Sequence, residues 1–330
     1  MKQVLILGGR GFLGGHICRK FIERGYKVII QSTKSGDFDN LKDIKFHPNI
    51  EYLTCDYQNN ASMKSAFNRS DFLVHSSIPY PLCVFGQSQK RKIEMENLKY
   101  VLDLAIESKI KKSIFVSVCG TIGQQQKEIV DETNYAWDWN DTSSLKSKAI
   151  AEQMIVDYCK MGLNGIIVNP SMLVGEFDSR PSTGEFFKMV LQLPFGILKN
   201  HKLNIIDVSD SAEGIVLAIE KGRVGQRYIL ASNNTNFQEF TKNVRSIAGK
   251  PAIRIYAPDL LVKLICYFSE VHAYLFKKEK PAFPILGYNL ITTMQHYNCQ
   301  KAQDELQFIP KNAWGSVEKA FQWYKKNGFL

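Results

Sequence analysis

Three glycines near the start of the chain have the spacing of a phosphate-binding loop. Gly8, Gly11 and Gly14 stand in the run GGRGFLG, which follows an apolar segment and opens a helical pattern. Glycine permits the tight turn, lets a pyrophosphate approach the backbone and lets helix and strand pack closely. At the start of a βαβ unit this spacing predicts a dinucleotide site, and the alternative is a glycine-rich turn without a ligand. The loop residues expected to bind the cofactor are Gly8, Arg10, Gly11, Phe12, Leu13 and Gly14.

The end of the second predicted strand favours NADP(H) over NAD(H). Sites that prefer NAD usually carry an acid there, which bonds the ribose 2′-hydroxyl. This chain has Ser32, Thr33 and Lys34 instead. Hydroxyls and a lysine accommodate a 2′-phosphate that an acid would repel, and Arg10 in the glycine loop can reach the same phosphate. The alternatives are that Arg10 and Lys34 are solvated surface residues, or that Asp37 supplies an acid from farther along the chain.

A second group of residues with chemical potential lies in the run TSSLKSKAIAEQMI, residues 142–155. The pattern predicts the start of an amphipathic helix with Lys148 in its second turn. Side chains four residues apart lie on one helix face, so Ser144 shares the face of Lys148 one turn earlier. The alternative is that Lys148 is an ordinary exposed helix lysine.

These residues need a scaffold, and the chain predicts a doubly wound α/β fold. Short apolar runs alternate with longer helical patterns, for example 12–25 and 95–108. Strands that are apolar on both faces and spaced by helices indicate a parallel sheet buried between helix layers. Its ligand crevice then lies at the carboxyl ends of the strands. The predicted strands are 4–8, 27–32, 50–56, 71–77, 113–118 and 165–171.

The alternation becomes irregular after Gly175, which predicts a second, smaller and mainly helical domain that binds substrate. The chain returns to the sheet with a helix over 211–220 and a strand over 227–232. Thr235 and Gln238 have the spacing of a capping box for a helix that ends at Gly249. We therefore predict a dinucleotide-binding domain of residues 1–175 plus 203–234, and a substrate domain of residues 176–202 plus 235–330.

Bulk composition narrows the class of protein. The 330 residues suffice for one large or two modest domains with real cores. Cysteines are scattered singly with no CxxC pair, which indicates reduced thiols in a cytoplasmic protein and no zinc site. The first residues lack the long apolar region of a signal peptide. The net charge of +10 is spread along the chain without a basic block, so it suits an anionic small ligand and gives no support for nucleic-acid binding.

No stretch has the roughly 18 apolar residues that a membrane span needs. The nearest candidate, residues 257–276, is interrupted by Asp259, Lys263, Glu270 and His272. We expect this segment to be a buried or groove-lining helix, in preference to a helix on a membrane surface.

The chain resembles the extended short-chain dehydrogenase/reductase superfamily, of the NAD-dependent epimerase/dehydratase type. Within it the likeness is strongest to dihydroflavonol-reductase-like proteins and hopanoid-associated sugar epimerases. Each motif is degenerate, but their order and spacing together are specific and cover nearly the whole chain. The motifs are GGRGFLGGHI, Cys55-Asp56, DFLVHSS, SKAIAEQMI, NPSMLVG, IIDVSDSAEGIVLAIEKGRVGQRYIL, KAQDELQF and VEKAFQWYKKNGF.

The resemblance implies further cofactor contacts. Asp56 would bond the adenine, and Ser76 and Ser77 would line the cofactor at the end of the fourth strand. The segment from Pro170 to Leu173 would flank the nicotinamide, and Lys148 would bond the nicotinamide ribose hydroxyls. The family often pairs through two long helices, one of which would contain Lys148, so a homodimer is one alternative, and the sequence itself leaves the oligomeric state open.

The resemblance also implies catalytic positions, and most of them are altered here. The family uses a tyrosine four residues before the lysine as the proton-transfer group, and this chain has Ser144 there. A serine hydroxyl is shorter and far less acidic than a phenol. The family's strand-end Ser or Thr falls on Val118, next to Ser117, with Thr121 or Cys119 as alternatives. The asparagine of the preceding helix falls near Glu94, with Asn97 three residues later.

Three functions are therefore compatible with the sequence. The first is an NADP(H)-dependent oxidoreductase, a reductase or epimerase acting on a carbonyl or hydroxyl of a small molecule. Its proton would come from Ser144 through water, from Tyr80, from Tyr135 or from Glu94. The second is a lyase, isomerase or cyclase that binds NADP(H) without redox use. The third is a cofactor-binding sensor without catalysis. We favour the first, because the cofactor positions are intact.

Overall fold

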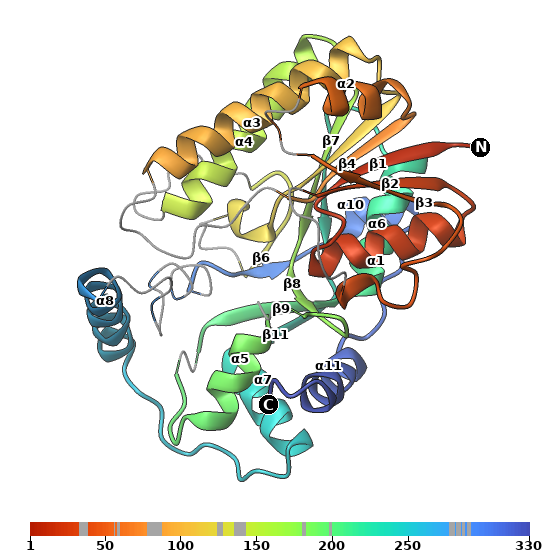
Figure 1. The fold of residues 1–330 in the computed structure, drawn as a ribbon. Helices are drawn as coiled ribbons and strands as arrows, with labels where there is room; N and C mark the ends of the chain where they lie inside the picture. Colours follow the sequence, from red (N-terminus) through yellow and green to blue (C-terminus); the bar gives the residue numbers. More distant parts are fainter. Residues whose placement is uncertain are drawn as a thin grey trace.

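The computed structural model shows an α/β protein in which helices cover both faces of a large sheet (Figure 1). The described residues are 1–32, 39–55, 57, 60–77, 88–123, 128–134, 143–179, 183–197, 200–276, 281, 285, 288 and 292–330. Several predicted site residues lie outside this described part: Thr33, Lys34, Asp37, Asp56, Tyr80 and Tyr135.

The large sheet has seven parallel strands in the order β10-β7-β5-β4-β1-β2-β3. The predicted doubly wound α/β class is confirmed. From β1 the chain moves outward to β2 and β3 on one side and to β4 on the other, so the order reverses beside β1. A ligand crevice is expected at the carboxyl ends of strands at such a reversal. The strands are β1 (Gln3–Leu7), β2 (Lys27–Ser32), β3 (Ile50–Thr54), β4 (Phe72–His75), β5 (Lys112–Val116), β7 (Gly165–Pro170) and β10 (Arg227–Leu230).

Two hydrophobic cores lie on the two faces of this sheet. In β1, Val4 and Ile6 belong to one core and Leu5 and Leu7 to the other, because successive strand residues point to opposite faces. This is why both faces of the strands are apolar in sequence. One face is covered by α1 (Phe12–Glu23), α6 (Val208–Lys221) and α10 (Gln300–Leu306). The other is covered by α2 (Asn60–Asn68), α3 (Ser88–Glu107) and α4 (Ser143–Lys160).

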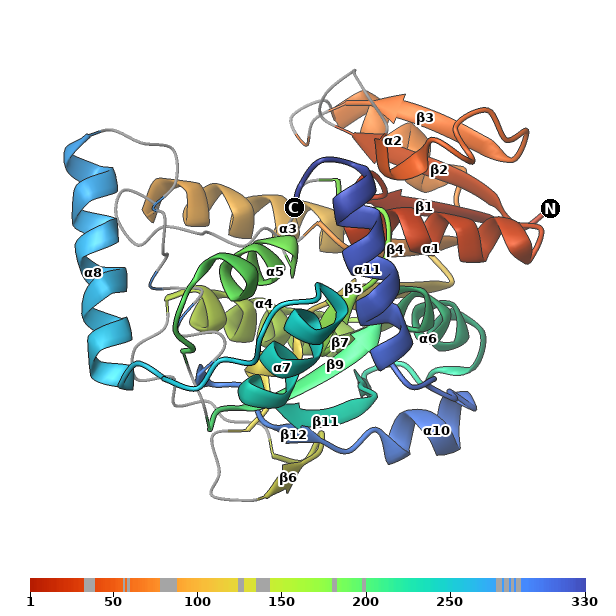
Figure 2. The ribbon, with the colours of Figure 1, turned by 90° about the horizontal axis from the view of Figure 1, so that it is seen from below.

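A smaller sheet builds a second packing unit below the first (Figures 1 and 2). It has the order β11-β9-β8, and its own core contains Phe187, Phe240 and Tyr324. The predicted two-domain division stays a prediction, and the packing adds that α10 lies in the core of the large sheet. The remaining strands are β6 (Ile129–Val130), β8 (Met172–Val174), β9 (Lys202–Asp207), β11 (Asn233–Asn236) and β12 (His296–Tyr297), and the helices around the small sheet are α5 (Thr183–Gln192), α7 (Phe237–Ile247) and α11 (Trp314–Lys326).

The cap of α7 differs from the predicted one by a residue. Asn236 is the N-cap, and its side chain accepts a hydrogen bond from the Glu239 N–H. Thr235 instead lies in β11 and bonds the Glu239 carboxylate with its hydroxyl. The capping-box prediction was wrong in register because the strand continues to Asn236, so the helix begins at Phe237.

Helix α8 (Asp259–Leu275) lies at the periphery in both views (Figures 1 and 2). The prediction that this helix is buried is wrong for most of its side chains, and the prediction that it lines a groove stays a prediction. Only Val262, Cys266, Glu270 and Ala273 are buried along it. Among the described residues, no helix is long and apolar enough to cross a membrane.

Candidate active site

The glycine loop joins β1 to α1 and has the geometry of a phosphate cradle. Gly8 has a φ of +86°, which favours glycine. A Cβ on Gly14 would stand 2.1 Å from the Gly8 carbonyl oxygen, so no side chain fits there. Gly11 is the N-cap of α1 and offers no side-chain cap, and the first turn carries no acid. The N–H groups of that turn, beginning at the half-buried Phe12 and Leu13, therefore suit an anionic pyrophosphate.

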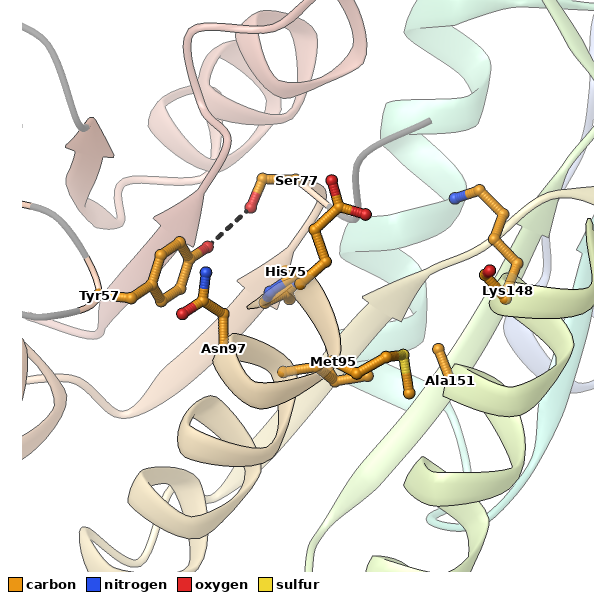
Figure 3. A pocket seen from close by; sticks show the side chains of 10 residues that line it. Tyr57, His75, Ser77, Met95, Asn97, Lys148 and Ala151 are labelled. Atoms are coloured by element: carbon orange, nitrogen blue, oxygen red, sulfur yellow. Dashed lines mark hydrogen bonds between the residues drawn. The ribbon is translucent and has the colours of Figure 1, made fainter. Parts of the chain in front are cut away.

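The residues that follow β4 pack directly against the glycine loop. A Cβ on Gly8 would lie 2.7 Å from the Ser77 Cβ and 3.0 Å from the Ser76 Oγ. Ser76 donates its hydroxyl to the Leu7 carbonyl at 3.0 Å, and Ser77 shares a hydrogen bond of 3.0 Å with the Tyr57 hydroxyl (Figure 3). The structure thus brings the two predicted serines directly beside the glycine loop.

The predicted 2′-phosphate residues Arg10 and Ser32 also meet. The Arg10 Nη1 donates to the Ser32 Oγ at 2.7 Å. The Asn40 Nδ2 donates to the Arg10 carbonyl at 3.0 Å, which holds the loop near the end of β2. A guanidinium therefore stands where the ribose of a bound dinucleotide is expected. Thr33 and Lys34 lie outside the described residues, as does Asp56.

Lys148 lies in the second turn of α4 and is buried, not an exposed helix lysine. Burial lowers the pKa of its ammonium from 10.5 to about 8, and the carboxylates of Glu152 and Glu94 oppose this shift. It lines a small cavity of about 50 Å³ between α3, α4 and the end of β4. Figure 3 shows Tyr57 on one side and Lys148 on the other, with Ser77 and His75 between them. The other lining residues are Glu94, Met95, Asn97, Leu98, Ser147 and Ala151.

The other residues that were predicted for the site do not all line this cavity. Glu94 on α3 lines the cavity together with Lys148, and its catalytic role stays a prediction. Ser144 lies in α4 one turn before Lys148, and its side chain is outside the described part. Pro170 ends β7 and is buried, whereas Leu173 in β8 is half-buried against the core of the large sheet. Pro170 therefore stands at the carboxyl end of β7, where the crevice is expected, and Leu173 follows it in the small sheet.

Ser117 takes part in a buried cluster around Glu152. Its hydroxyl donates to the Glu152 Oε1, as does the Thr121 hydroxyl at 2.6 Å and the Asn169 Nδ2 at 2.9 Å. The Arg227 Nη2 pairs with the Glu152 Oε2 at 2.7 Å, and Glu152 is only 1% exposed. The hydroxyls of Ser117 and Thr121 therefore point toward this carboxylate.

Cys119, the other proposed strand-end group, is buried and donates its thiol to the Asn169 carbonyl at 2.9 Å. Burial raises the pKa of this thiol well above its usual value. It is therefore a structural cysteine, neither exposed nor thiolate at neutral pH.

The sequence analysis did not predict Glu152, Arg227 or His75 as site residues. Glu152 follows Lys148 by four residues, so the shared helix face was a signal for it. His75 is buried at the end of β4, and burial lowers the pKa of its imidazole to about 4, so the ring is neutral at physiological pH. Its Nδ1 has no hydrogen-bond partner among the described residues.

The sheet order and the glycine turn between β1 and α1 define a Rossmann-type protein. More narrowly, the chain belongs to the NAD dependent epimerase/dehydratase family, whose model matches residues 4–231. A protein of Synechocystis sp. with the provisional name dihydroflavonol 4-reductase is 26% identical, over 98% of this chain and 95% of that protein.

Two further comparisons extend over the second packing unit. The sterol demethylase protein B of Methylococcus capsulatus is 20% identical over 99% of both chains. The crystal structure of gox2253 superposes with a TM-score of 0.81 at 26% identity, and covers the whole of both chains. The shared architecture therefore includes the small sheet and its helices as well as the dinucleotide fold.

Proposed function

We propose that the chain is an NADP(H)-dependent oxidoreductase that acts on a carbonyl or hydroxyl group, with Ser144 in place of the family's tyrosine. The observation that carries this proposal is the buried Lys148 beside Glu94, in a cavity next to the glycine loop. A buried lysine with a lowered pKa lies beside a carboxylate, in a cavity at the edge of the sheet where ligands bind in this fold. Such an arrangement favours a chemical role for these side chains over a structural one.

The bound cofactor would supply or accept hydride at the reacting carbon. The glycine loop and the start of α1 would hold the pyrophosphate of the cofactor. Arg10 and Ser32 would hold its 2′-phosphate, and Ser76 and Ser77 would line the cofactor at the end of β4. Lys148 would hold the nicotinamide ribose hydroxyls and keep a positive charge near the substrate oxygen. In the reduction, the oxygen that develops negative charge would take a proton from the Ser144 hydroxyl through water. A proton from solvent, accepted and passed on by the Glu94 carboxylate beside Lys148, would then restore the hydroxyl.

The direct test follows NADPH absorbance with a panel of carbonyl compounds. The names of the relatives suggest dihydroflavonols and sterols that carry a ketone as the first two classes. Oxidation of NADPH in step with formation of alcohol supports the proposal. Binding of NADPH that raises the melting temperature without turnover on any class would favour a sensor, and turnover that consumes no NADPH would favour a lyase or isomerase.

Replacement of Arg10 by alanine tests the cofactor preference. A charge-assisted hydrogen bond contributes about 1.5–3 kcal/mol, so we expect the Kd for NADPH to rise by roughly 10- to 150-fold while the Kd for NADH stays within about threefold. Isothermal titration with both cofactors measures this. Arg254→Ala is the control, since Arg254 is exposed and lies in the small unit. Equal weakening of NADPH and NADH in the Arg10 variant would contradict the 2′-phosphate assignment.

Replacement of Ser144 by alanine tests the proton path. Loss of one neutral hydrogen bond costs about 1 kcal/mol, so kcat/KM should fall roughly fivefold, with an unchanged Kd for NADPH. Ser143→Ala removes the neighbouring hydroxyl of the same helix and should leave kcat/KM unchanged. If both serine variants keep full activity, the proton comes from another group, and Glu94→Gln then identifies or excludes the carboxyl.

A further inference from the structure

Helix α8 presents a broad apolar surface to its surroundings. Phe268 is 65% exposed and Leu260 is 72% exposed, values normal for charged side chains rather than hydrophobic ones. Residues three and four apart are neighbours on a helix, so these side chains form one patch. Contiguous patches of this kind mark interaction sites. The exposed apolar residues are Leu260, Leu261, Leu264, Ile265, Tyr267, Phe268, Tyr274, Leu275 and Phe276.

A narrow strip fixes α8 to the rest of the protein. Val262, Cys266, Glu270 and Ala273 recur every three or four residues and are buried. The Glu270 Oε1 accepts the Ile285 N–H at 3.3 Å. At the other end of the helix, His201 and Asp259 lie 2.6 Å apart. The apolar patch therefore faces away from the contacts that hold the helix.

The shape of α8 matches the surface of a bilayer. Its 17 residues span about 25 Å, short of the roughly 30 Å of a bilayer's hydrocarbon core, and Asp259, Lys263 and Glu270 interrupt it. A helix with an apolar face opposite a narrow attachment strip can lie in the interface between headgroups and acyl chains. Of its three charged side chains, Glu270 is buried, Asp259 lies against His201 and Lys263 is exposed. Lys263 is therefore the charge beside the apolar patch, and a lysine there favours anionic headgroups.

We infer that α8 docks the protein onto an anionic phospholipid bilayer. A second copy of the chain is a poorer occupant of the patch, because the same face of that copy would bring a second Lys263 to the contact, whereas an anionic headgroup neutralises the Lys263 charge. This inference goes beyond the proposed function and stands without it, because it concerns a surface outside the candidate active site.

Flotation of the full chain with vesicles tests the inference. We expect binding to vesicles of equimolar phosphatidylcholine and phosphatidylglycerol, weaker binding to phosphatidylcholine alone, and release by high salt. Leu264→Ser combined with Phe268→Ser should lower the partition coefficient by about 100-fold, since each buried side chain of this size contributes about tenfold or more. Both positions are exposed, so the melting temperature should stay the same.

The matched control is Phe46→Ser combined with Ile309→Ser. These residues are 90% and 85% exposed but lie outside α8, so the control should bind as the native chain does. Absence of binding to the anionic vesicles would overturn the inference, as would equal loss in both double variants. A dimer on gel filtration that the α8 variants abolish, without any vesicle binding, would assign the patch to a second copy instead.

Discussion

Replacement of Lys148 by methionine should lower kcat/KM for carbonyl reduction by about 10² to 10⁴ while the protein stays folded. Methionine fills similar space but removes the charge that we place beside the ribose and the substrate oxygen. Steady-state kinetics with NADPH and the best carbonyl substrate measure the loss. Lys146→Met is the control, because Lys146 is exposed on the same helix. Comparable loss in the two variants would show that the effect is not specific to the cavity.

Lys148→Met should lower activity but raise the stability of the folded protein. The pKa of Lys148 is about 8 in the folded protein, against an ordinary value of 10.5 that applies to the unfolded chain. Between these values the unfolded state holds a proton that the native state lacks, so stability rises with pH from about 8 to 10.5. Below pH 8 the native state has to bury the charge. Lys148→Met removes this cost, so the free energy of unfolding at pH 7 should increase by up to about 3 kcal/mol.

The pH profile separates this role from simple packing. The cationic form of Lys148 is present below its pKa of about 8, so kcat/KM should fall as pH rises through this value. In Lys148→Met the remaining activity should lose this inflection. If the inflection near pH 8 persists in the variant, another group causes it and the charge of Lys148 is not required.

The fold could be predicted from sequence because its determinants are local. A strand buried on both faces is apolar throughout, so β1 and β2 were visible as short runs, and the glycine loop between β1 and α1 is a local motif. The burial of individual side chains, in contrast, could not be predicted from local sequence. A helix with an apolar stripe looks the same whether the stripe meets a core or the outside, which is why the burial of α8 was predicted wrongly.

The position of the glycine loop could be predicted because a short motif defines it, whereas its role as a cofactor site stays a prediction. Arg10 and Ser32 meet because that loop and the end of β2 lie at the same edge of the sheet. The partners of Glu152 could not be predicted, because Ser117, Asn169 and Arg227 come from β5, β7 and β10 or their ends. Those contacts depend on the strand order and on the direction of each side chain, and a local sequence pattern predicts neither.

This cluster yields the second large expected effect. Glu152→Ala should lower the free energy of unfolding by about 3–5 kcal/mol, because it leaves the Arg227 guanidinium without its carboxylate and the buried Ser117 hydroxyl without its acceptor. Thr121 and Asn169 also lose a hydrogen bond to Glu152 but keep hydrogen bonds to the Val118 carbonyl. Chemical denaturation measures the loss. Asp157→Asn is the control on the same helix; Asp157 is half exposed, and a change there should stay within about 0.5 kcal/mol.

A double variant distinguishes a buried ion pair from a general packing defect. Glu152→Gln combined with Arg227→Met removes both charges, so it should be more stable than Glu152→Gln alone, which leaves the guanidinium uncompensated. The Glu152 carboxylate also raises the pKa of Lys148. In Glu152→Gln the fall of kcat/KM with rising pH should therefore move to lower pH. An unmoved inflection together with additive stability losses would show that Glu152 supports the fold without acting on Lys148.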